Sequence, residues 1–519
     1  MQPLTRALAG ALTAAALVLG AGVADADTSV EAGRPSSTSP EEPPSSIGWK
    51  PCPENGTPAE CGTLRLPIDW ARPGGEKFGL AVARLTAADP DRRVGVLLVN
   101  PGGPGESGVN FVRQRAETYF SADVRARFDI VGFDPRGIGA SSPVTCSQGL
   151  LDRQPSPYPR DQAEFDRLVA YNRELREDCR RHSGPIFDHA DTLGVVRDME
   201  AFRRSLGEQK ITYFGHSYGT LIGEQYAELY GDRIRAMALT ANIDHSLGAR
   251  DFLVSSAATA EDSFRQFVRW CDRSPSCALH GRNVTAVWDG LLARADRGEI
   301  RDPDHPDQAL TANAITRTAF TMFYGPDWDQ LAAYVAELDA QTAAAPGPAT
   351  ASDTTRETKE SEAFPAVFCQ DWRIRARNYP EYARLTAAEL RAAPHMRGSP
   401  RVHAGVAGCL GWPDQVNNPQ HRLRITKAPK ILLMHSRHDP ANNYSWVTHV
   451  HRQTRGTTVL LTYEGAGHSV YGRSDCTRGA ADGYLTALKV PDDGSRCAAV
   501  EPVADPGPAP ATSASRTGP

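Results

Sequence analysis

Residues 213–220 read Tyr-Phe-Gly-His-Ser-Tyr-Gly-Thr, which places Ser217 at the centre of a Gly-x-Ser-x-Gly pattern. A short apolar run typical of a buried strand comes directly before the pattern, and apolar residues at helical spacing follow it. On a sharp turn from strand to helix the serine is strained and its hydroxyl is exposed, and side chains at Gly215 and Gly219 would collide with their neighbours. The stretch therefore predicts Ser217 as a nucleophile, although five residues alone are a weak signal.

Apolar runs typical of buried parallel strands recur along the chain and alternate with helical patterns. One of them leads into the serine, and two others follow only after a long gap. This alternation predicts an α/β fold with a mostly parallel central sheet, in which ligands bind at the carboxyl ends of the strands. The expected strands are residues 95–99, 128–133, 211–214, 235–239, 431–434 and 458–461.

Asp439 and His468 follow the last two expected strands and come after the serine in the chain. A nucleophilic serine needs a base, and the base needs an acid that orients it, in the chain order Ser, Asp, His. Asp439 could instead be a turn residue before Pro440, and His468 a histidine of a surface loop. The order, at two consecutive strand ends, favours Asp439 as the acid and His468 as the base. His435 and His438 lie in the loop of the acid and are poorer candidates for the base.

A glycine-rich segment, residues 100–108 with the sequence Asn-Pro-Gly-Gly-Pro-Gly-Glu-Ser-Gly, follows the first expected strand. Glycines let backbone N–H groups approach a substrate carbonyl closely. We assign the oxyanion hole to the N–H groups of Tyr218 and Gly103, with Gly102 as the alternative to Gly103. A phosphate-binding loop is disfavoured because the segment lacks the Lys-Ser/Thr ending and the Gly-x-Gly-x-x-Gly spacing. These features together predict a serine hydrolase with the α/β-hydrolase fold.

The first residues of the chain have the pattern of a secretory signal peptide. Arg6 supplies a positive charge, an apolar stretch follows over residues 7–23, and Ala24-Asp25-Ala26 offers the small residues that a signal peptidase reads. A membrane anchor is the alternative, but the run is short and rich in Ala and Gly. We therefore expect a secreted, extracellular protein that has no stable membrane insertion after cleavage behind Ala26.

The long gap between the fourth and fifth expected strands is mainly helical and predicts a cap inserted into the sheet fold. An independent domain on a linker is disfavoured, since no joint rich in Pro and Gly flanks the segment, whereas both chain ends have disorder-prone compositions. The expected division is a signal peptide at 1–26, a disordered lead-in at 27–46, the first part of the α/β-hydrolase core at 47–245, a helical cap at 246–427, the second part of the core at 428–499 and a disordered tail at 500–519.

Charge and cysteine content narrow the expected partners and compartment. A formal net charge of −5 gives no reason to expect nucleic acid as a partner. Ten cysteines in an exported chain predict disulfides, and zinc is disfavoured because the chain has no pair of Cys-x-x-Cys motifs. Short intervals favour pairing of neighbours, although sequence alone does not determine the connectivity; the expected pairs are Cys52–Cys61, Cys146–Cys179, Cys271–Cys277, Cys369–Cys409 and Cys476–Cys497.

As a set, these motifs resemble the secreted tripeptidyl aminopeptidases of actinomycetes, which are serine exopeptidases of the prolyl aminopeptidase family. The resemblance implies hydrolysis of peptides near a free N-terminus by Ser217, Asp439 and His468, with no metal or organic cofactor. Such enzymes often follow the acid with a Pro-Val-Thr-Pro-like run, whereas residues 440–443 read Pro-Ala-Asn-Asn here, which leaves the substrate preference open. The likeness runs from about Trp49 to the Cys476 region and rests on residues 100–105, Asp134-Pro135-Arg136-Gly137, residues 215–220 and Gly467-His468.

An aminopeptidase must hold the α-ammonium group of its substrate, and a carboxylate at the edge of the cleft is the simplest means. Glu106, beside the glycine-rich segment, and Asp371, in the expected cap, are the two candidates. Either could also be an ordinary solvated carboxylate. The expected partners are peptide substrates, bound by a monomer.

Two other functions remain open from the residues alone. A secreted carboxylesterase or lipase would use the same triad, and fold analogy does not separate it from a peptidase. A catalytically silent binding protein that kept the fold is disfavoured because all three triad residues are present. A haloalkane dehalogenase or epoxide hydrolase is disfavoured because those enzymes need Asp where this chain has Ser217.

Overall fold

The computed structural model describes residues 46–53, 58–341, 363–413 and 415–502. These residues all belong to the unit Pro44–Pro519, whereas the unit Met1–Pro43 lies outside the described residues. The expected signal peptide at 1–26, nearly all of the lead-in at 27–46 and most of the tail at 500–519 therefore lie outside them as well. Among the described residues, no helix combines the length and the apolar character that a membrane span requires.

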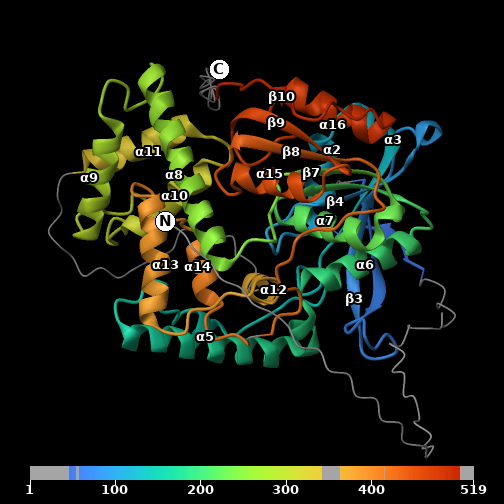
Figure 1. The fold of residues 1–519 in the computed structure, drawn as a ribbon, viewed down its shortest axis with the longest axis horizontal. Coiled ribbons are helices and arrows are strands. Elements are labelled where there is room, and N and C mark those ends of the chain that lie inside the picture. Colours follow the sequence, from blue (N-terminus) through green and yellow to red (C-terminus); the bar gives the residue numbers. More distant parts are fainter. Residues whose placement is uncertain (1–45, 54–57, 342–362, 414, 503–519) are drawn as a thin grey trace, which may run out of the picture. The chain divides into compact units, whose positions relative to one another are not determined.

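The described residues form a ten-stranded sheet in the order β1-β2-β3-β5-β4-β6-β7-β8-β9-β10 (Figure 1). Strands β4 to β10 pair in parallel, and β1 to β3 add an antiparallel edge next to β5. The six expected strands are β4 to β9, so the prediction of a mostly parallel central sheet is confirmed. The strands are β1 Lys50–Pro51, β2 Glu60–Pro67, β3 Lys77–Leu85, β4 Gly95–Asn100, β5 Phe128–Phe133, β6 Ile211–His216, β7 Ile234–Thr240, β8 Ile431–His438, β9 Thr458–Ala466 and β10 Ser495–Cys497.

Helices cover both faces of this sheet. Leu98 of β4 packs in one core cluster with residues of α6 and α7, while its neighbours Leu97 and Val99 pack in another with residues of α1 and α16. Burial on both faces explains why these strands are continuous apolar runs in the sequence. The helices beside the sheet are α1 Gly108–Gln114, α2 Ala116–Tyr119, α3 Ala122–Arg127, α6 Thr192–Ser205, α7 Tyr218–Tyr230, α15 Tyr444–Gln453 and α16 Asp475–Ala487.

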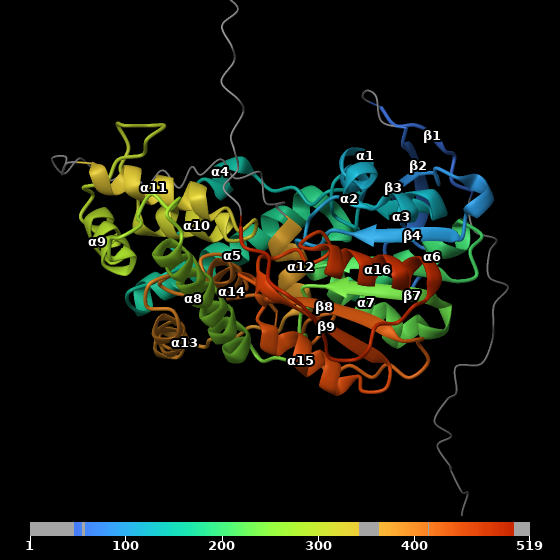
Figure 2. The ribbon, with the colours of Figure 1, turned by 90° about the horizontal axis from the view of Figure 1, so that it is seen from above.

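The described residues between β7 and β8 are mainly helical and are here called the helical insertion. The two flanking strands are direct parallel neighbours in the sheet, with Met237 paired to Ile431, so the chain leaves the sheet at the carboxyl end of β7 and returns to it at the amino end of β8. Much of the insertion has a core of its own, which includes Trp288 and Leu331. Figures 1 and 2 show α9, α10 and α11 to one side of the sheet. Its helices are α8 Ala249–Arg273, α9 Val284–Asp296, α10 Ala312–Met322, α11 Trp328–Ala340, α12 Ala363–Asp371, α13 Tyr379–Ala392 and α14 Val402–Gly408.

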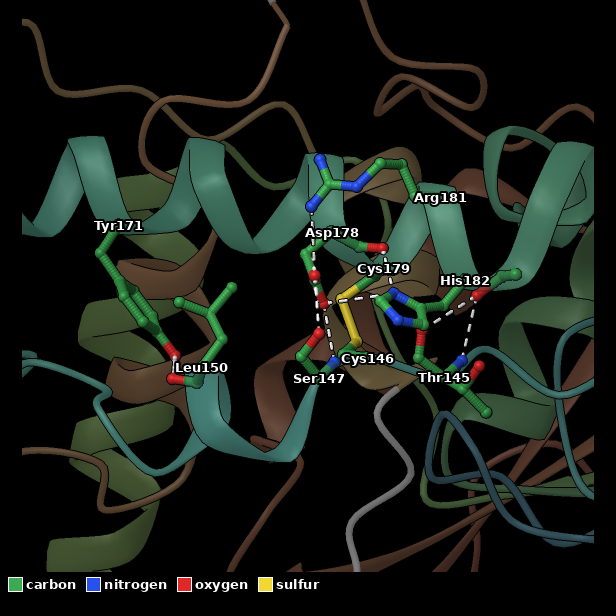
Figure 3. The surroundings of a disulfide bond; sticks show 10 residues. Thr145, Cys146, Ser147, Leu150, Tyr171, Asp178, Cys179, Arg181 and His182 are labelled. Carbon is green, nitrogen blue, oxygen red and sulfur yellow. Dashed lines mark hydrogen bonds and ion pairs between the residues drawn. A yellow bond between two sulfur atoms is a disulfide. The ribbon is translucent and has the colours of Figure 1, made fainter.

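Helix α5 (Gln162–Ser183) precedes the serine in the chain but packs against the insertion, across the start of α13 and the end of α14 (Figure 1). The Nδ2 of Asn172 donates to the carbonyl oxygens of Ala407 and Leu410, at 2.8 and 2.9 Å. Figure 3 shows the Cys146–Cys179 disulfide, which ties α5 to the segment before α4 (Gln148–Leu151). By its contacts α5 therefore extends the insertion, although the sequence analysis placed it within the first part of the core.

All ten cysteines lie in the described residues and form five disulfides. The expected pairing of sequence neighbours is confirmed for each of them. The pairs are Cys52–Cys61, Cys146–Cys179, Cys271–Cys277, Cys369–Cys409 and Cys476–Cys497.

Candidate active site

Ser217 lies at the sharp turn between β6 and α7. Its backbone has φ 54° and ψ −122°, a strained conformation that a serine adopts only where its surroundings impose it. A Cβ at Gly219 would lie 2.5 Å from the carbonyl oxygen of Asn100, and a Cβ at Gly215 would lie 2.6 Å from that of Gly219. The two glycines therefore allow β4, β6 and α7 to approach closely enough to form the turn.

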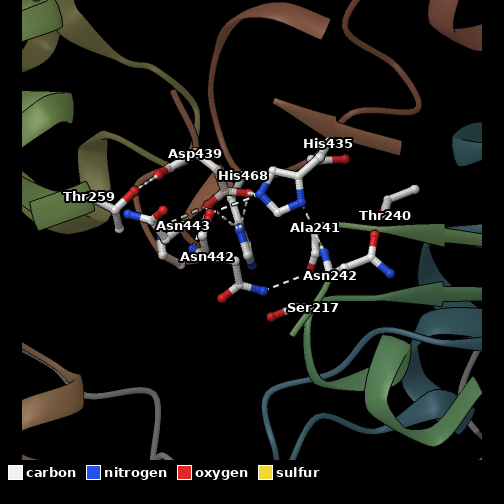
Figure 4. Close-up of polar contacts among 12 residues, drawn as sticks. Ser217, Thr240, Ala241, Asn242, Thr259, His435, Asp439, Asn442, Asn443 and His468 are labelled. Carbon is white, nitrogen blue, oxygen red and sulfur yellow. Dashed lines mark hydrogen bonds and ion pairs between the residues drawn. The ribbon is translucent and has the colours of Figure 1, made fainter. Parts of the chain in front are cut away.

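His468 and Asp439 are in direct contact at the ends of β9 and β8 (Figure 4). The Nδ1 of His468 lies 2.9 Å from Oδ1 and 3.0 Å from Oδ2 of Asp439, and both residues are buried. The backbone N–H groups of Ala441 and Asn442 also donate to Oδ1 of Asp439, at 2.8 and 2.9 Å. Burial alone would raise the pKa of Asp439, but its polar interactions, those with His468 foremost, together outweigh burial and lower it. A charged Asp439 can keep the Nδ1 proton on His468 and leave Nε2 free to accept another.

Two nearby histidines are held in other pairs. Nδ1 of His435 accepts from the backbone N–H of Asn242 at 3.1 Å, so its Nε2 carries the proton and donates to the carbonyl oxygen of Asn442 at 2.9 Å. Burial lowers the pKa of His435, which keeps this ring neutral. Nδ1 of His438 lies 2.7 Å from a carboxylate oxygen of Asp262, on α8. Neither ring lines the cavity around Ser217.

The loop after Asp439 differs from the Pro-Val-Thr-Pro-like run of the family, and its two asparagines hold the loop in place. Asn442 donates through Nδ2 to the carbonyl oxygen of Ala241 at 2.6 Å, beyond the end of β7. Asn443 donates to the carbonyl oxygen of Ser255 on α8 at 3.1 Å. The loop thereby joins Asp439 to the sheet on one side and to the helical insertion on the other.

The glycine-rich segment lies against the serine turn. A Cβ at Gly102 would lie 2.5 Å from the carbonyl oxygen of His216 and 2.8 Å from the backbone nitrogen of Tyr218. The N–H of Gly102 donates to Oδ1 of Asn100 at 3.0 Å, so it is already paired. Gly103, one residue further, is exposed and lines the cavity. Tyr218 is the first residue of α7, where backbone N–H groups have no partner within the helix.

A cavity of about 240 Å³ brings most of the predicted residues together. Ser217, His468, Gly103 and Glu106 all line it. No hydrogen bond joins the Ser217 hydroxyl to His468 among the described residues; such bonds are often long before substrate binds. The wall also includes the aromatic side chains Phe111, Tyr119 and Phe214, together with His216, Arg115, Tyr324, Arg401 and Ser469. Within the described residues, no group of three or more His, Cys, Asp or Glu side chains could hold a metal ion.

Glu106 is the carboxylate of this cavity wall. Partial loss of water contact in the cavity wall raises its pKa, and the guanidinium groups of Arg115 and Arg401 act in the opposite direction. The cavity therefore places one carboxylate among cationic groups close to Ser217.

Asp371 lies elsewhere, at the end of α12, and it does not line the cavity. Its side chain is 0% exposed and accepts four hydrogen bonds from protein groups. A substrate amine in the cavity has no access to this carboxylate. A substrate anchor was expected at the edge of the cleft, whereas Asp371 is buried outside the cavity.

The helical insertion also contacts His468, the candidate base. The backbone N–H of His468 donates to the carbonyl oxygen of Tyr324 at 3.1 Å, and the two rings are in edge contact with centroids 4.7 Å apart. The guanidinium of Arg473 donates to the carbonyl oxygens of Ser469 at 2.8 Å, of Tyr324 at 2.6 Å and of Gly325. These contacts tie the loop of His468 to the residues that follow α10.

Sequence reasoning did not identify Tyr324, Arg401, Arg115 or Arg473. Tyr324 and Arg401 lie in the insertion, where no strand end or motif marks a residue as facing the serine. Arg473 follows His468 by five positions but has no pattern of its own. The contacts that bring Tyr324, Arg401 and Arg473 to the site depend on the packing of the insertion against the sheet, whereas Arg115 lies in the core, between α1 and α2.

The fold and this geometry agree with comparisons to known proteins. The family model of the alpha/beta hydrolase fold matches residues 95–472, and the chain belongs to this family. It is a serine hydrolase. The chain is 29% identical over 490 residues to serine protease Hip1 of Mycobacterium tuberculosis, covering 87% of this chain and 91% of that protein.

Two further relatives are named for different activities. The chain is 27% identical over 460 residues to a tripeptidyl aminopeptidase of Streptomyces coelicolor, covering 85% of this chain and 83% of that one. It is 30% identical over 465 residues to carboxylesterase B of Mycobacterium tuberculosis, covering 85% and 86%. Peptidases and an esterase therefore share the architecture, as expected where one fold supports several reactions.

Proposed function

We propose that this chain is a secreted serine aminopeptidase that hydrolyses peptide bonds near the free N-terminus of peptides. The observation that carries the proposal is that His468, which is in contact with Asp439, lines the same cavity as Ser217 on its strained turn. The similarity to a serine protease and to a tripeptidyl aminopeptidase supports the choice of a peptide substrate.

In this proposal Ser217 is the nucleophile, His468 the base and Asp439 the acid that orients it. Oγ of Ser217 attacks the carbonyl carbon of the scissile bond while Nε2 of His468 takes the hydroxyl proton. The tetrahedral intermediate collapses when His468 gives that proton to the leaving amine, and an acyl-enzyme ester remains on Ser217. Water, deprotonated by His468, then attacks the ester, and the acid product leaves with the serine restored.

The negative charge on the carbonyl oxygen needs donors already in place. We assign these donors to the backbone N–H groups of Gly103 and Tyr218. The pairing of the Gly102 N–H with Asn100 supports Gly103 over Gly102, because a donor bound to the protein would have to give up that partner first. Loss of one such donor costs about 10²- to 10³-fold in kcat in other serine hydrolases.

Glu106 is the proposed anchor of the substrate ammonium group. It lines the cavity with Ser217, and a carboxylate there can form a charge-assisted hydrogen bond to an amine. Glu106→Gln should raise KM for peptides with a free N-terminus and leave KM for N-acetylated peptides and for esters unchanged. An equal rise for all three substrates would remove this role.

The second candidate function is a carboxylesterase that uses the same three residues, and the similarity to carboxylesterase B favours it. Hydrolysis of an Ala-Ala-Pro anilide with a free amine, of its N-acetyl form and of a short acyl nitrophenyl ester separates the two. The peptidase proposal predicts the highest kcat/KM on the free-amine anilide. Turnover of the ester with none of either anilide would favour the esterase.

Export is part of the same proposal. The signal-peptide pattern at residues 1–26 supports it, and five disulfides are compatible with an oxidising compartment. Detection of the chain in culture medium, starting after Ala26, would test this part.

A further inference from the structure

Two groups of Tyr218, its backbone N–H and its phenol, point to different parts of the molecule. Its backbone nitrogen begins α7 directly after Ser217, where we propose that it donates to the oxyanion. Its side chain points away from the cavity, and the phenol O–H donates to Oδ2 of Asp371 at 2.7 Å. Both side chains are buried, so water does not compete for this bond.

Asp371 is surrounded by donors from three parts of the chain. The backbone N–H and the hydroxyl of Thr192, at the start of α6, donate to it at 2.9 and 2.6 Å. Nδ2 of Asn418, in the segment before β8, donates at 2.9 Å. With the phenol of Tyr218 these make four donors, which favour the ionised carboxylate because that group only accepts. Burial and the charge of Asp191 act in the opposite direction and raise the pKa of Asp371 to about 7. The result is a fixed acceptor directly behind the serine turn.

We propose that Asp371 is a positioning residue that holds Tyr218 by its phenol and thereby keeps the Tyr218 N–H aimed at the oxyanion. The proposal rests on the proposed function and deepens it. It links the end of α12, in the helical insertion, to a donor of the reaction centre. It also replaces the role of substrate anchor, since Asp371 lies outside the cavity.

If Asp371 only stabilised the fold, its replacement would lower stability and leave kcat unchanged. The network continues from Asn418 to Gln225, at 3.0 Å, and from the carbonyl of Asp371 to Nε2 of His245, at 2.6 Å, so its loss is expected to lower stability. Lower stability alone leaves kcat unchanged at temperatures well below unfolding. A donor that is no longer aimed at the oxyanion lowers kcat without weakening substrate binding, since the oxyanion forms only during the reaction.

The test is Tyr218→Phe, which removes one oxygen and keeps the ring and the backbone, together with Asp371→Asn and the double variant. We expect kcat to fall about tenfold in each single variant, with KM within about twofold, for both the Ala-Ala-Pro anilide and the nitrophenyl ester. The double variant should be no slower than the slower single one, because both changes break the same bond.

Tyr226→Phe is the matched control. This buried tyrosine lies on the same helix and donates to Glu200 at 2.9 Å, and it does not line the cavity. The control should lose stability without losing kcat. If Asp371→Asn does not fold, Tyr218→Phe alone decides the matter.

The outcomes separate this proposal from the one that it rests on. Wild-type kcat in Tyr218→Phe, on an enzyme that turns over either substrate, would overturn the positioning role alone. A rise in KM confined to free-amine peptides in Asp371→Asn would also overturn it and restore the anchor. A wild type that hydrolyses neither substrate and takes up no fluorophosphonate would overturn the proposed function, and the positioning role with it.

Discussion

Asp439 and His468 each determine the state of the other. The carboxylate is buried, accepts two backbone N–H groups and lies within 3.0 Å of the imidazole Nδ1, which requires a proton on that nitrogen. Asp439→Asn would present an amide N–H to Nδ1 and stabilise the opposite tautomer, whose Nε2 no longer accepts a proton. We expect kcat to fall about 10³- to 10⁴-fold while the fold is retained, measured as ester turnover and by circular dichroism.

Asp262→Asn is the control for this change. Asp262 pairs with His438 at 2.7 Å, so the same chemistry is altered outside the cavity. This variant should keep kcat within about twofold of the wild type. Comparable losses in both variants would mean that the Asp439 pair has no special part in the reaction.

Glu224, in the middle of α7, should make stability depend on pH. Its Oε1 accepts from Nδ2 of Asn242 at 3.0 Å, whereas its Oε2 and the Oδ1 of Asn242 are buried without a partner among the described residues. A proton on the carboxyl supplies the missing donor. Burial raises the pKa of Glu224 well above its ordinary value of 4.5, and the charges of Asp244 and Glu228 act in the same direction.

The raised pKa of Glu224 determines whether the stability of the fold rises or falls with pH. Because the folded pKa is above the unfolded one, the protonated form is favoured by folding, and stability falls as pH rises from 4.5 through the folded pKa. The loss approaches ~1.4 kcal/mol per pH unit for one such group. Glu224→Gln does not ionise and carries the donor, so its unfolding free energy should depend less on pH between about 5 and 7 in urea titrations. Equal slopes for the two proteins would contradict the account.

At the scale of the elements, the position of the loop after β9, which carries His468, depends on contacts with the helical insertion. Arg473 donates to carbonyl oxygens on both sides of the junction, those of Ser469 and Tyr324 among them. Arg473→Lys keeps the charge but lacks the planar fork of donors that spans several acceptors. We expect about a tenfold lower kcat and faster hydrogen exchange in residues 467–470. Arg496→Lys, which alters only an exposed pair with Glu464, should change neither quantity.

Sequence patterns predicted the strands that are buried on both faces and did not predict the elements whose placement depends on tertiary contacts. Strands β4 to β9 were predicted because both of their faces are buried. The antiparallel strands β2 and β3 were not expected, because the stretch containing β2 has polar and small residues such as Cys61 and Gly62 between its apolar ones. The placement of α5 against the insertion depends on contacts such as Asn172 with Ala407, for which the sequence has no pattern.

The same distinction applies to the candidate site. That Ser217, Asp439, His468 and the glycine-rich segment lie close together could be predicted, because each follows a strand and strand ends meet at one edge of a parallel sheet. Asp371 was placed at the cleft edge because charge alone cannot distinguish a solvated carboxylate from one that is 0% exposed. Its burial depends on Tyr218, Thr192 and Asn418, which are far from it in the chain.

At the scale of the whole molecule, the disulfides close loops of very different length. Cys369–Cys409 closes a loop of 40 positions within the insertion, and Cys271–Cys277 one of only 6. Loop entropy predicts a loss of ~4 kcal/mol when the first pair is replaced by alanines and ~2 kcal/mol for the second. Denaturant unfolding of the two double variants would measure the difference. A larger loss for the Cys271–Cys277 pair would show that loop length is not the dominant contribution.

The central claim, that Ser217 is the activated nucleophile of a serine hydrolase, has a direct test. The wild-type protein is treated with a fluorophosphonate, digested and mapped by mass spectrometry, with folded Ser217→Ala in parallel. The account predicts one adduct per chain, on the peptide that contains Ser217, and none on the variant. Absence of an adduct, or an adduct on another residue that persists in Ser217→Ala, would contradict it.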